Sequence, residues 1–465
     1  MVAEFEVTPE RTLFLGHDPQ EGGRRLWTHD TRDSVGVVAP PGYGKTAGII
    51  APSVFAWDGP AIVATTRGDL LRLTGDHRRR LAEPHGGRVF VYDPLRTEPG
   101  VSTVGWSPID GCQDATLCFK RVEEMTATLA QGVSNADHWR DGAAEILRGY
   151  LHAAALGRLD ILTVRRWLAQ QEIEEPTRIL RGDSRAAAHW ADDLDGLSKL
   201  GERERGTFYS TAKQALKATT EPNVLASVGL PGVSIDEFLA SKSTLYIVGP
   251  IHYQQVMAPM IVGLVDSIVQ RAVLLAAASP TGRIDPPLLV ALDEVANIAP
   301  MMSLPAMVSE YGGRGIATLW ATQTLSRMRV RYGRDEADAI LQSSTAKLIY
   351  GAMSNGDDLR NISSWAGEYR EPQVTFYAGD GVDPRMSPQQ PGRLVGRDNE
   401  GHTHAIGYMY RPALPVQSLQ QLPPLQAWLW YRSDPPLLVH APPAGIVPAY
   451  QAVAGWTPEL LAVSP

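Results

Sequence analysis

The stretch "VVAPPGYGKTAGII", Val37 to Ile50, constrains the fold more than any other part of the chain. A short apolar run leads into a glycine-containing turn, a Gly-Lys-Thr triplet and an apolar helix start, which is the order of parts in a phosphate-binding loop. Such a loop aims backbone N–H groups at phosphate, and adds a lysine for the β- and γ-phosphates and a hydroxyl for Mg²⁺. The expected binding residues are Pro41, Gly42, Tyr43, Gly44, Lys45 and Thr46.

One position departs from the usual pattern, which opens with glycine where this chain has Ala39. A residue at that position needs only a negative φ. Gly42 and Gly44 occupy the positions where the backbone passes closest to phosphate, and there glycine matters more. The alternative to a phosphate-binding loop is an ordinary strand, turn and helix with an exposed lysine, and the rest of the chain decides between the two.

Six further apolar runs, bounded by Gly, Pro and polar residues, repeat the pattern of the strand before the loop. Runs of this kind are typical of strands buried on both faces, as in a mostly parallel sheet covered by helices. They are "AIVAT" (61–65), "RVFVYDP" (88–94), "TLYIVGP" (244–250), "LLVALDE" (288–294), "IATLWATQ" (316–323) and "AKLIYGA" (346–352). The sequence therefore predicts an α/β fold with a mostly parallel central sheet.

Between the third and fourth runs of the chain, the apolar spacing changes to that of helices, as in "ATLCFKRVEEMTATLAQ". We expect an all-α domain inserted into the nucleotide-binding domain. The predicted division is 1–110 for the first part of the nucleotide-binding domain, 111–239 for the insertion, 240–430 for the second part and 431–465 for a Pro-rich tail. The glycine- and proline-rich stretch at 377–402 is expected to form long loops with at most one hairpin.

The second half of a nucleotide site is an apolar strand that ends in a carboxylate for the Mg²⁺ shell, followed in hydrolases by a residue that activates water. In "PPLLVALDEVANIAP", Asp293 is the candidate metal-side carboxylate and Glu294 the candidate base. Gln323 ends the next strand, where an amide can sense the γ-phosphate if the two strands are neighbours. Taken alone, an Asp-Glu pair could be a solvated turn, and Gln323 an ordinary satisfied polar residue.

Composition limits the classes of partner. The formal net charge of −8 excludes a global basic field, so any contact with nucleic acid must be local. The basic clusters "DHRRR" (76–80) and "RMRVRYGR" (327–334) could meet phosphate, although such runs are more often solvated faces. Cys112 and Cys118 have neither a zinc nor a redox spacing, which fits a reducing cytoplasmic setting.

No signal peptide is recognisable at the N-terminus, because acidic residues stand where a basic region would be needed. The longest apolar stretch, Met257 to Ser279, is interrupted by Asp266, Gln270 and Arg271. We expect it to be a buried or amphipathic helix and not a membrane span.

Several segments, in this order and spacing, resemble the TraG/TraD-like coupling ATPases of type IV secretion and conjugation. They include "LLVALDEVANI", "SEYGGRGIATLWATQTLSRMRVRYG", "ILQSSTAKLIYGAMSNGDDLRNISSWAG" and the closing "LPVQSLQQLPPLQAWLWYRSDPPLLV". The resemblance extends over roughly Ser34 to Val439, nearly the whole chain. It implies a RecA-like P-loop NTPase core with an inserted all-α domain, and a ring, expected to be a homo-hexamer. It also implies hydrolysis of ATP with Mg²⁺ that is coupled to DNA translocation.

The implied partners are DNA with its attached relaxase, accessory proteins, and a type IV secretion channel or a membrane-anchor partner. Family members usually begin with transmembrane helices, whereas this sequence starts almost directly at the motor domain. A separate anchor partner, a soluble variant or a trimmed chain would each explain this start. The expected location is cytoplasmic, at the inner face of the cell membrane through a partner. Where the family commonly has Asp-Pro-Lys-Gly-Glu, this chain has Thr65 to Asp69.

The family also places an arginine shortly after the catalytic glutamate, facing the nucleotide of the neighbouring subunit. Here Gly312 and Gly313 stand just before the next strand, and the nearest basic residue is Arg314. Arg314 is thus a shifted match for a trans-acting catalytic arginine, and the alternative is a solvated arginine. Two other functions also remain open, a nucleotide-gated adaptor that recruits protein cargo without processive movement and a related ring ATPase that pumps DNA.

Overall fold

The computed structural model describes residues 11–129, 135–187, 189–376, 394–397 and 403–447. The sequence expectations for the first ten residues, for most of the loops at 377–402 and for the tail beyond 447 lie outside these residues. Within them, the chain is built around an 11-stranded sheet with the strand order β2-β1-β14-β13-β9-β3-β8-β7-β4-β6-β5.

Parallel strands make up the larger part of this sheet, and every run that the sequence singled out is one of them. They are β3 (Val35–Val38), β4 (Ala61–Thr65), β5 (Val89–Tyr92), β6 (Thr244–Val248), β7 (Leu288–Leu292), β8 (Ile316–Thr322) and β9 (Ala346–Tyr350). The mostly parallel arrangement confirms the predicted fold class. Because parallel strands carry their loops at the same end, the segments that follow β3, β7 and β8 meet at one edge of the sheet.

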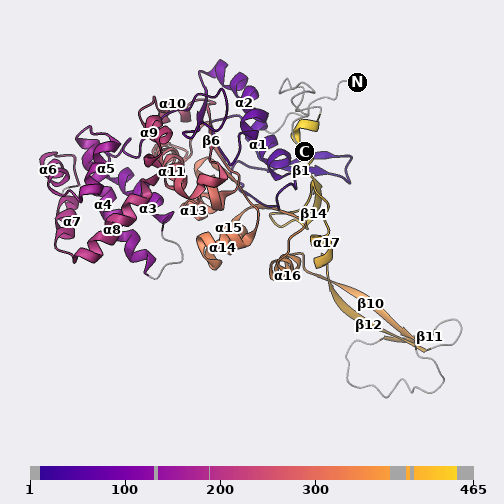
Figure 1. Cartoon of the computed structure of the whole chain (residues 1–465). Coiled ribbons are helices and arrows are strands. Elements are labelled where there is room, and N and C mark those ends of the chain that lie inside the picture. The colour runs from indigo at the N-terminus through magenta and orange to yellow at the C-terminus, as the bar shows by residue number, and fades with distance from the viewer. Residues whose placement is uncertain (1–10, 130–134, 188, 377–393, 398–402, 448–465) are drawn as a thin grey trace.

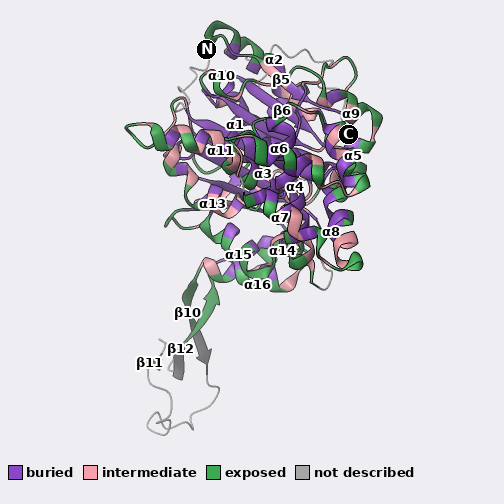
Figure 2. Ribbon diagram, turned by 90° about the vertical axis from the view of Figure 1, so that its left-hand side faces the viewer, coloured by how far each residue is buried: buried purple, intermediate pink, exposed green. Residues whose placement is uncertain are grey.

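Both faces of the sheet are buried, which explains why the strands appear in the sequence as continuous apolar runs. Leu288, Val290 and Leu292 of β7 point into one core, and Leu289 and Ala291 into the other, as the two-residue period of a strand requires. Figure 2 shows the buried strands at the centre of the molecule.

Helices cover both faces of the sheet. One face packs against α1 (Ala51–Ala56) and α2 (Asp69–Ala82). The opposite core contains buried side chains from the later helices of the chain. These are α11 (Gln254–Ala278), α12 (Val295–Ile298), α13 (Leu304–Ser309), α14 (Leu325–Tyr332), α15 (Arg334–Ser343), α16 (Gly356–Trp365) and α17 (Val416–Gln420).

An antiparallel group of strands extends the sheet beyond β9, and the strand analysis of the sequence did not predict it. It consists of β1 (Phe14–Asp18), β2 (Arg24–Trp27), β13 (Gln426–Tyr431) and β14 (Leu437–His440). β14 lies inside the segment assigned to a Pro-rich tail, so the described part of that segment belongs to the central sheet. The prolines Pro435 and Pro436 precede the strand, where they cost no ladder hydrogen bond.

Helices fill the segment between β5 and β6 (Figure 1). They are α3 (Ala115–Ala127), α4 (Ala136–Leu156), α5 (Ile161–Gln170), α6 (Glu174–Gly182), α7 (His189–Ser198), α8 (Glu202–Ala215), α9 (Pro222–Val228) and α10 (Ile235–Leu239). The first six share a core of their own. Phe238 and Leu239 of α10 are instead buried in the core beneath the sheet, so the last helices of this segment pack with the nucleotide-binding domain.

Helix α11 is the longest helix of the described residues and is rich in apolar side chains. The stretch Ile251–Ala278 is long and apolar enough to cross a membrane; its most apolar window has a mean hydropathy of 1.8, and 72% of that window is buried within the protein. The helix packs against the sheet on one side and against α3 on another. Burial from several sides accounts for its composition, because a helix enclosed in a core needs no polar face.

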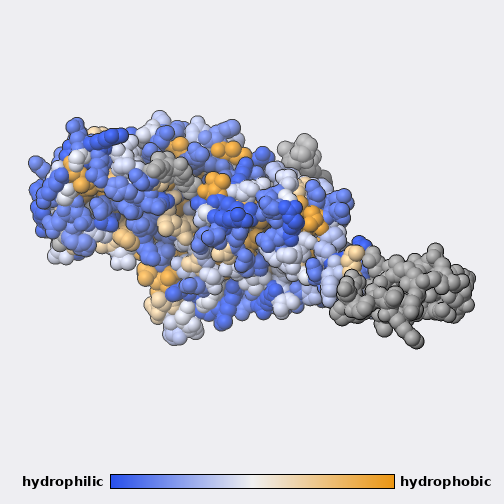
Figure 3. Space-filling view, turned by 90° about the horizontal axis from the view of Figure 1, so that it is seen from below, coloured by the Kyte–Doolittle hydropathy of each residue, from blue (hydrophilic) through white to orange (hydrophobic). Residues whose placement is uncertain are grey.

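A second, three-stranded sheet projects from the body as a ribbon at the end opposite α3–α8 (Figure 1). It consists of β10 (Glu368–Phe376), β11 (Leu394–Arg397) and β12 (Thr403–Pro412), with β12 in the middle. Side chains near the base of the ribbon are exposed, including Tyr369 and Tyr410. Elsewhere, on the face that Figure 3 presents, apolar side chains form small separate groups among hydrophilic ones.

Close packing of β3 against β8 generates a prediction about stability. A Cβ atom at Gly36 would lie 2.6 Å from Cζ2 of Trp320, whose indole N–H is fixed by a hydrogen bond to Ser344. Gly36→Ala should therefore lower the free energy of unfolding by about 1–3 kcal/mol, as overpacking of a filled core does. Urea unfolding followed by tryptophan fluorescence measures the effect.

The matched control is Gly313→Ala, because a Cβ atom there meets no atom within 4 Å. The control should unfold at the wild-type urea concentration. If Gly36→Ala does the same, Trp320 can move aside and the packing is looser than the geometry indicates.

Candidate nucleotide site

The phosphate-binding loop follows β3 at the edge of the sheet where the parallel strands end. Gly42 has φ = 80° and Gly44 has φ = 92°, both in the left-handed region that favours glycine. The backbone N–H of Ala39 donates to the Thr322 carbonyl of β8 at 3.1 Å, so an alanine here continues the strand pairing. After Lys45 the chain enters a widened helical turn, Thr46–Ile50, that runs into α1.

Residues that flank the antiparallel strands β13 and β14 contact this loop from behind. The N–H of Leu425 donates to the Tyr43 carbonyl at 3.2 Å, and the N–H of Ala441 donates to the Leu425 carbonyl at 2.7 Å. A Cβ atom at Gly44 would lie 2.5 Å from the Leu425 side chain. The closing segment of the chain therefore holds the loop from behind. In the sequence, the only signal for this segment is that it matches the closing segment of the coupling ATPase family.

Four side chains of the predicted site meet in one buried cluster. The Lys45 ammonium lies 2.5 Å from Oε1 of Glu294 and 3.7 Å from Oδ1 of Asp293. The Thr46 hydroxyl donates to Oδ2 of Asp293 at 2.9 Å. Asp293 and Glu294 come directly after β7. The fold brings these two residues next to Lys45 and Thr46, although about 250 residues separate the two pairs in the sequence.

The carboxylates of this cluster are incompletely paired. Within the described residues, Oε2 of Glu294 is buried without a partner, Oε1 of Glu294 has the Lys45 ammonium beside it, and Oδ1 of Asp293 is buried with that ammonium only at 3.7 Å. Burial raises the pKa of Asp293 to about 6, the attraction of Lys45 lowers it, and repulsion from Glu294 raises it. Buried acceptors without donors are costly, and such groups commonly mark the place of a ligand or an ion. The donor set, one ammonium, one hydroxyl and two carboxylates, fits a nucleotide with its Mg²⁺.

The backbone of Glu294 is also unusual, with φ = 61° and ψ = 50°. A non-glycine residue in the left-handed region costs free energy, and such residues are frequent at functional sites. The conformation ends β7 abruptly and starts α12, whose Asn297 N–H donates to the Glu294 carbonyl at 2.9 Å. Glu294 is therefore fixed at a corner between a strand and a short helix.

Gln323 follows β8, which lies between β3 and β7 and pairs with both. The two strands that carry Glu294 and Gln323 are thus neighbours, the condition on which the sensor role was predicted. The residue is half-buried beside the phosphate-binding loop. Its role at the γ-phosphate stays a prediction.

Arg314 lies in the short helical turn Tyr311–Arg314 that precedes β8. It is therefore at the opposite end of that strand from Gln323, roughly 20 Å away for seven residues of strand. The arginine cannot reach the nucleotide site of its own chain. A catalytic contact would have to cross to another subunit.

A further acidic residue contributes to the site, at the end of the Thr65–Asp69 stretch. The Thr65 hydroxyl lies 3.4 Å from Oδ1 of Asp69. The Asp69 charge adds to the causes that raise the pKa of Asp293, which places it close to the cluster. In the sequence, this stretch stands out only as a departure from the family pattern.

Comparison with known proteins identifies relatives of the chain. A family model described as type IV secretory system conjugative DNA transfer matches residues 8–376. The conjugal transfer protein TraG of Escherichia coli is 24% identical over 349 residues, which cover 69% of this chain and 53% of the relative. Protein VirD4 of Rhizobium radiobacter is 24% identical over 341 residues, which cover 72% and 48%. The chain spans about half the length of these relatives.

Solved structures share the fold. The bacterial conjugative coupling protein TrwBdeltaN70, in an unbound monoclinic form, matches with a TM-score of 0.65 and 14% identity over 94% of this chain and 90% of that one. Plasmid coupling protein TrwB in complex with the non-hydrolysable ATP analogue ADPNP matches with a TM-score of 0.60 and 15% identity, over 89% and 86%. Both likenesses agree with the predicted RecA-like fold class.

The buried cluster generates a prediction about pH. The folded-state pKa of Asp293 is about 6, above the value of about 3.9 expected in the unfolded chain. Between these values the folded state binds more protons, so the contribution of Asp293 to the free energy of unfolding falls as pH rises from 4 to 6. The loss between pH 4 and 6 amounts to about 2 kcal/mol, and the rest follows as pH rises above 6. Asp293→Asn should remove it, as measured by urea unfolding without nucleotide across this pH range.

Asp335→Asn provides the control, because it deletes one exposed carboxylate elsewhere in the nucleotide-binding domain. Its pH profile should match that of the wild type. Parallel profiles for Asp293→Asn and the wild type would contradict the raised pKa.

Proposed function

Because the chain belongs to the type IV secretory system conjugative DNA transfer family, we propose that it is a coupling protein that hydrolyses ATP to drive DNA into a secretion channel. The observation that carries this proposal is the buried cluster of Lys45, Thr46, Asp293 and Glu294 at the phosphate-binding loop. Its composition is that of a site for ATP and Mg²⁺.

Each residue has a distinct role in this proposal. Lys45 turns from the carboxylates toward the β- and γ-phosphates, and the backbone N–H groups of the loop bind the same phosphates. Thr46 and Asp293 hold the Mg²⁺ shell, which neutralises phosphate charge when the ion is bound. Glu294 accepts a proton from the attacking water, and Gln323 orients the γ-phosphate or that water.

Relatives support the choice of cofactor. Structures of TrwB have been solved with the ATP analogue ADPNP and with ADP and Mg²⁺. Oε2 of Glu294, which is buried without a partner among the described residues, favours hydrolysis over a pure nucleotide switch, because a base needs a free lone pair next to the phosphates.

The proposed substrate is DNA with its attached relaxase. The inserted helices α3–α8 would contact relaxase or accessory proteins, and the ring would be a homo-hexamer. The proposed location is the cytoplasmic side of the cell membrane, in contact with the secretion channel or a membrane-anchor partner. ATP turnover that rises with protein concentration and with added DNA would test the function as a whole.

In the ring, Arg314 would act on the nucleotide of the adjacent subunit. Its position away from its own site is compatible with this role and with a solvated arginine alike. An arginine that reaches across a subunit boundary stabilises charge developing on the γ-phosphate, and its removal can cost about 10³ or more in rate.

Replacement of Glu294 by Gln should separate binding from hydrolysis. We expect the variant to bind ATP with Mg²⁺ through Lys45, Thr46 and Asp293, and to hydrolyse it at least about 10²-fold more slowly, because the base is lost. Lys45→Ala should fail already at binding, since the loop loses its cation. Fluorescent nucleotide titration and phosphate release measure the two steps. A fully active Glu294→Gln variant would remove Glu294 from the catalytic set.

Mixing of subunits tests Arg314. Arg314→Ala protein should bind ATP and assemble but hydrolyse poorly. Addition of Lys45→Ala protein should restore part of the ATP turnover, because mixed rings contain some interfaces at which an intact Lys45 faces an intact Arg314. Two Arg314→Ala preparations mixed together serve as the control. Turnover that is independent of concentration and survives Arg314→Ala would assign the arginine no catalytic role.

A further inference from the structure

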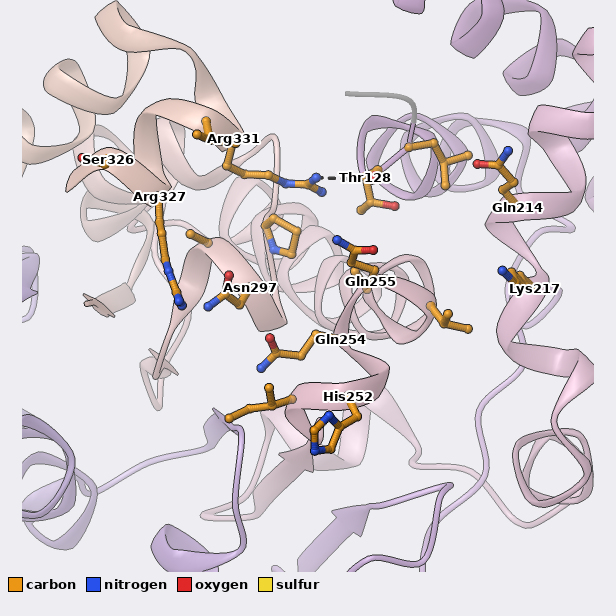
Figure 4. Close-up of a pocket in the computed structure, with 17 residues that line it drawn as sticks. Thr128, Gln214, Lys217, His252, Gln254, Gln255, Asn297, Ser326, Arg327 and Arg331 are labelled. Atoms are coloured by element: carbon orange, nitrogen blue, oxygen red, sulfur yellow. Dashed lines mark hydrogen bonds between the residues drawn. The ribbon is translucent and has the colours of Figure 1, made fainter. Parts of the chain in front are cut away.

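A small pocket, of about 320 Å³, lies where α3 of the helical insertion packs against α11 of the nucleotide-binding domain. We call it the α3–α11 pocket. α3 and α11 both line it, and residues of the segments 104–111 and 232–236 complete its wall. It is distinct from the larger pocket of Figure 4, into which Arg327 and Arg331 reach from α14.

Most of the wall of the α3–α11 pocket is apolar. A volume of 320 Å³ is near the lower end of the range for ligand sites, so a small molecule fits and a peptide segment does not. Such a molecule would need an apolar body to match the wall. The apolar side chains that line the pocket include Val104, Trp106, Leu117, Val233, Leu264 and Ile268.

A buried carboxylate interrupts this apolar wall. Asp266 of α11 is only 1% exposed, and Nε2 of Gln270 donates to its Oδ1 at 3.0 Å. In the described part of the chain Asp266 forms no ion pair. Burial raises its pKa, while the hydrogen bond from Gln270 and the charges of Arg121 and Lys120 lower it. A buried charge without an ionic partner is costly, and a cationic group in the pocket would offset that cost.

A second buried carboxylate adds to the negative charge at this place. Burial raises the pKa of Glu124 of α3, and the charge of Asp266 raises it further, so the two groups act on each other. The oxygens of Glu124 accept hydrogen bonds from the backbone of Met302 and Ser303, which supply donors but no positive charge. Two adjacent buried acids with this repulsion favour a cation beside them.

The remaining acidic groups of the pocket already have partners in the structure. Asp236 accepts two hydrogen bonds from the Arg271 guanidinium, at 2.6 and 2.9 Å, and this pair is exposed to solvent. Asp110 is also exposed, and its Oδ2 accepts the Ser107 N–H at 3.0 Å. Asp266 is therefore the acid of the lining that is both buried and without a cation.

Arg121 lines the pocket as well, and it leaves one donor unused. Its guanidinium donates to the Pro108 carbonyl at 2.8 Å and to the Asp110 carbonyl, and it lies 5.5 Å from the centre of the Trp106 ring. Arg121 is only 4% exposed, and among the described residues its Nε has no hydrogen-bond partner. A ligand that carries an acceptor next to its cation would satisfy this N–H.

We propose that the α3–α11 pocket binds a small organic amine, with its ammonium group against Asp266 and its apolar body against Trp106 and Ile268. An ammonium donates charge-assisted hydrogen bonds to a carboxylate, which are stronger than neutral ones, and an aromatic body adds contact with the Trp106 ring. The bound molecule would contact both α3 and α11 and so hold the insertion against the nucleotide-binding domain. This inference goes beyond the proposed function and does not depend on it.

The test is isothermal titration calorimetry of the full chain with tryptamine at neutral pH. Tryptophol, which has a hydroxyl in place of the ammonium, and indolepropionate, which has a carboxylate, are the matched ligands. We expect tryptamine to bind at least roughly tenfold more tightly than tryptophol, because only the ammonium pairs with Asp266. Indolepropionate should not bind, since it would bring a further negative charge to Asp266 and Glu124.

Two variants locate the ammonium. Asp266→Asn keeps the shape of the side chain and removes its charge, so it should bind tryptamine roughly tenfold more weakly and tryptophol as the wild type does. The control is Asp236→Asn, which removes a carboxylate that Arg271 already neutralises at the same pocket. Its affinity for tryptamine should stay within about twofold of the wild type.

Each outcome either supports the inference or overturns it. Equal affinities of the wild type for tryptamine and tryptophol would overturn the choice of an amine. Unchanged tryptamine affinity in Asp266→Asn, or an equal loss in Asp236→Asn, would overturn the position of the ammonium. A wild-type chain that does not bind tryptamine at all would overturn the site. If Asp266→Asn fails to fold, the comparison of the two ligands on the wild type still decides. None of these measurements involves ATP or DNA, so failure of the pocket leaves the proposed function untouched.

Discussion

The contact of Lys45 with Glu294 and Asp293 is the interaction on which the rest of the structure depends. An ammonium and two carboxylates are buried together at 2.5 Å and 3.7 Å, although removal of such charges from water is expensive. The attraction between opposite charges offsets this desolvation cost. The sheet order β3-β8-β7 makes the contact possible, because it brings the loop after β3 and the carboxylates after β7 to one edge of the sheet. In this structure, the Lys45 ammonium neutralises the carboxylates of Glu294 and Asp293. With a nucleotide bound, the same ammonium would contact the phosphates.

The antiparallel strands give this edge its rigidity. β13 pairs with β9, the neighbour of β3, and the open end of the β13–β14 hairpin carries the contacts of Leu425, which precedes β13, and Ala441, which follows β14. Gly44 and Gly48 leave room for these flanking residues, since a Cβ atom at Gly48 would lie 2.3 Å from the Ala441 carbonyl oxygen. The glycines of the loop therefore serve packing against the closing segment as well as the approach of phosphate.

Much of this organisation could be predicted from the sequence, and the exceptions have physical causes. Parallel strands with two buried faces are continuous apolar runs, so all of them were recognisable, as were Asp293 and Glu294 at the end of one. β2 carries charged, partly exposed residues at its start and lacks that signal. The inward contacts of Phe238 and the left-handed backbone of Glu294 depend on tertiary packing, which no local pattern records.

The helical insertion is tied to the segment that follows Glu294, which limits how the two parts can move. Glu124 of α3 accepts hydrogen bonds from the N–H groups of Met302 and Ser303 at 2.7 and 2.8 Å. Burial and the nearby Asp266 raise the pKa of Glu124, while these hydrogen bonds lower it, so the bonds help this buried carboxylate to keep its charge. A rotation of the insertion must either break both bonds, leaving the carboxylate without donors, or carry residues 302–303 with it. Residues 302–303 lie a few positions beyond α12, which begins directly after Glu294. If they move with the insertion, the movement is therefore transmitted toward Glu294, the candidate base of the nucleotide site.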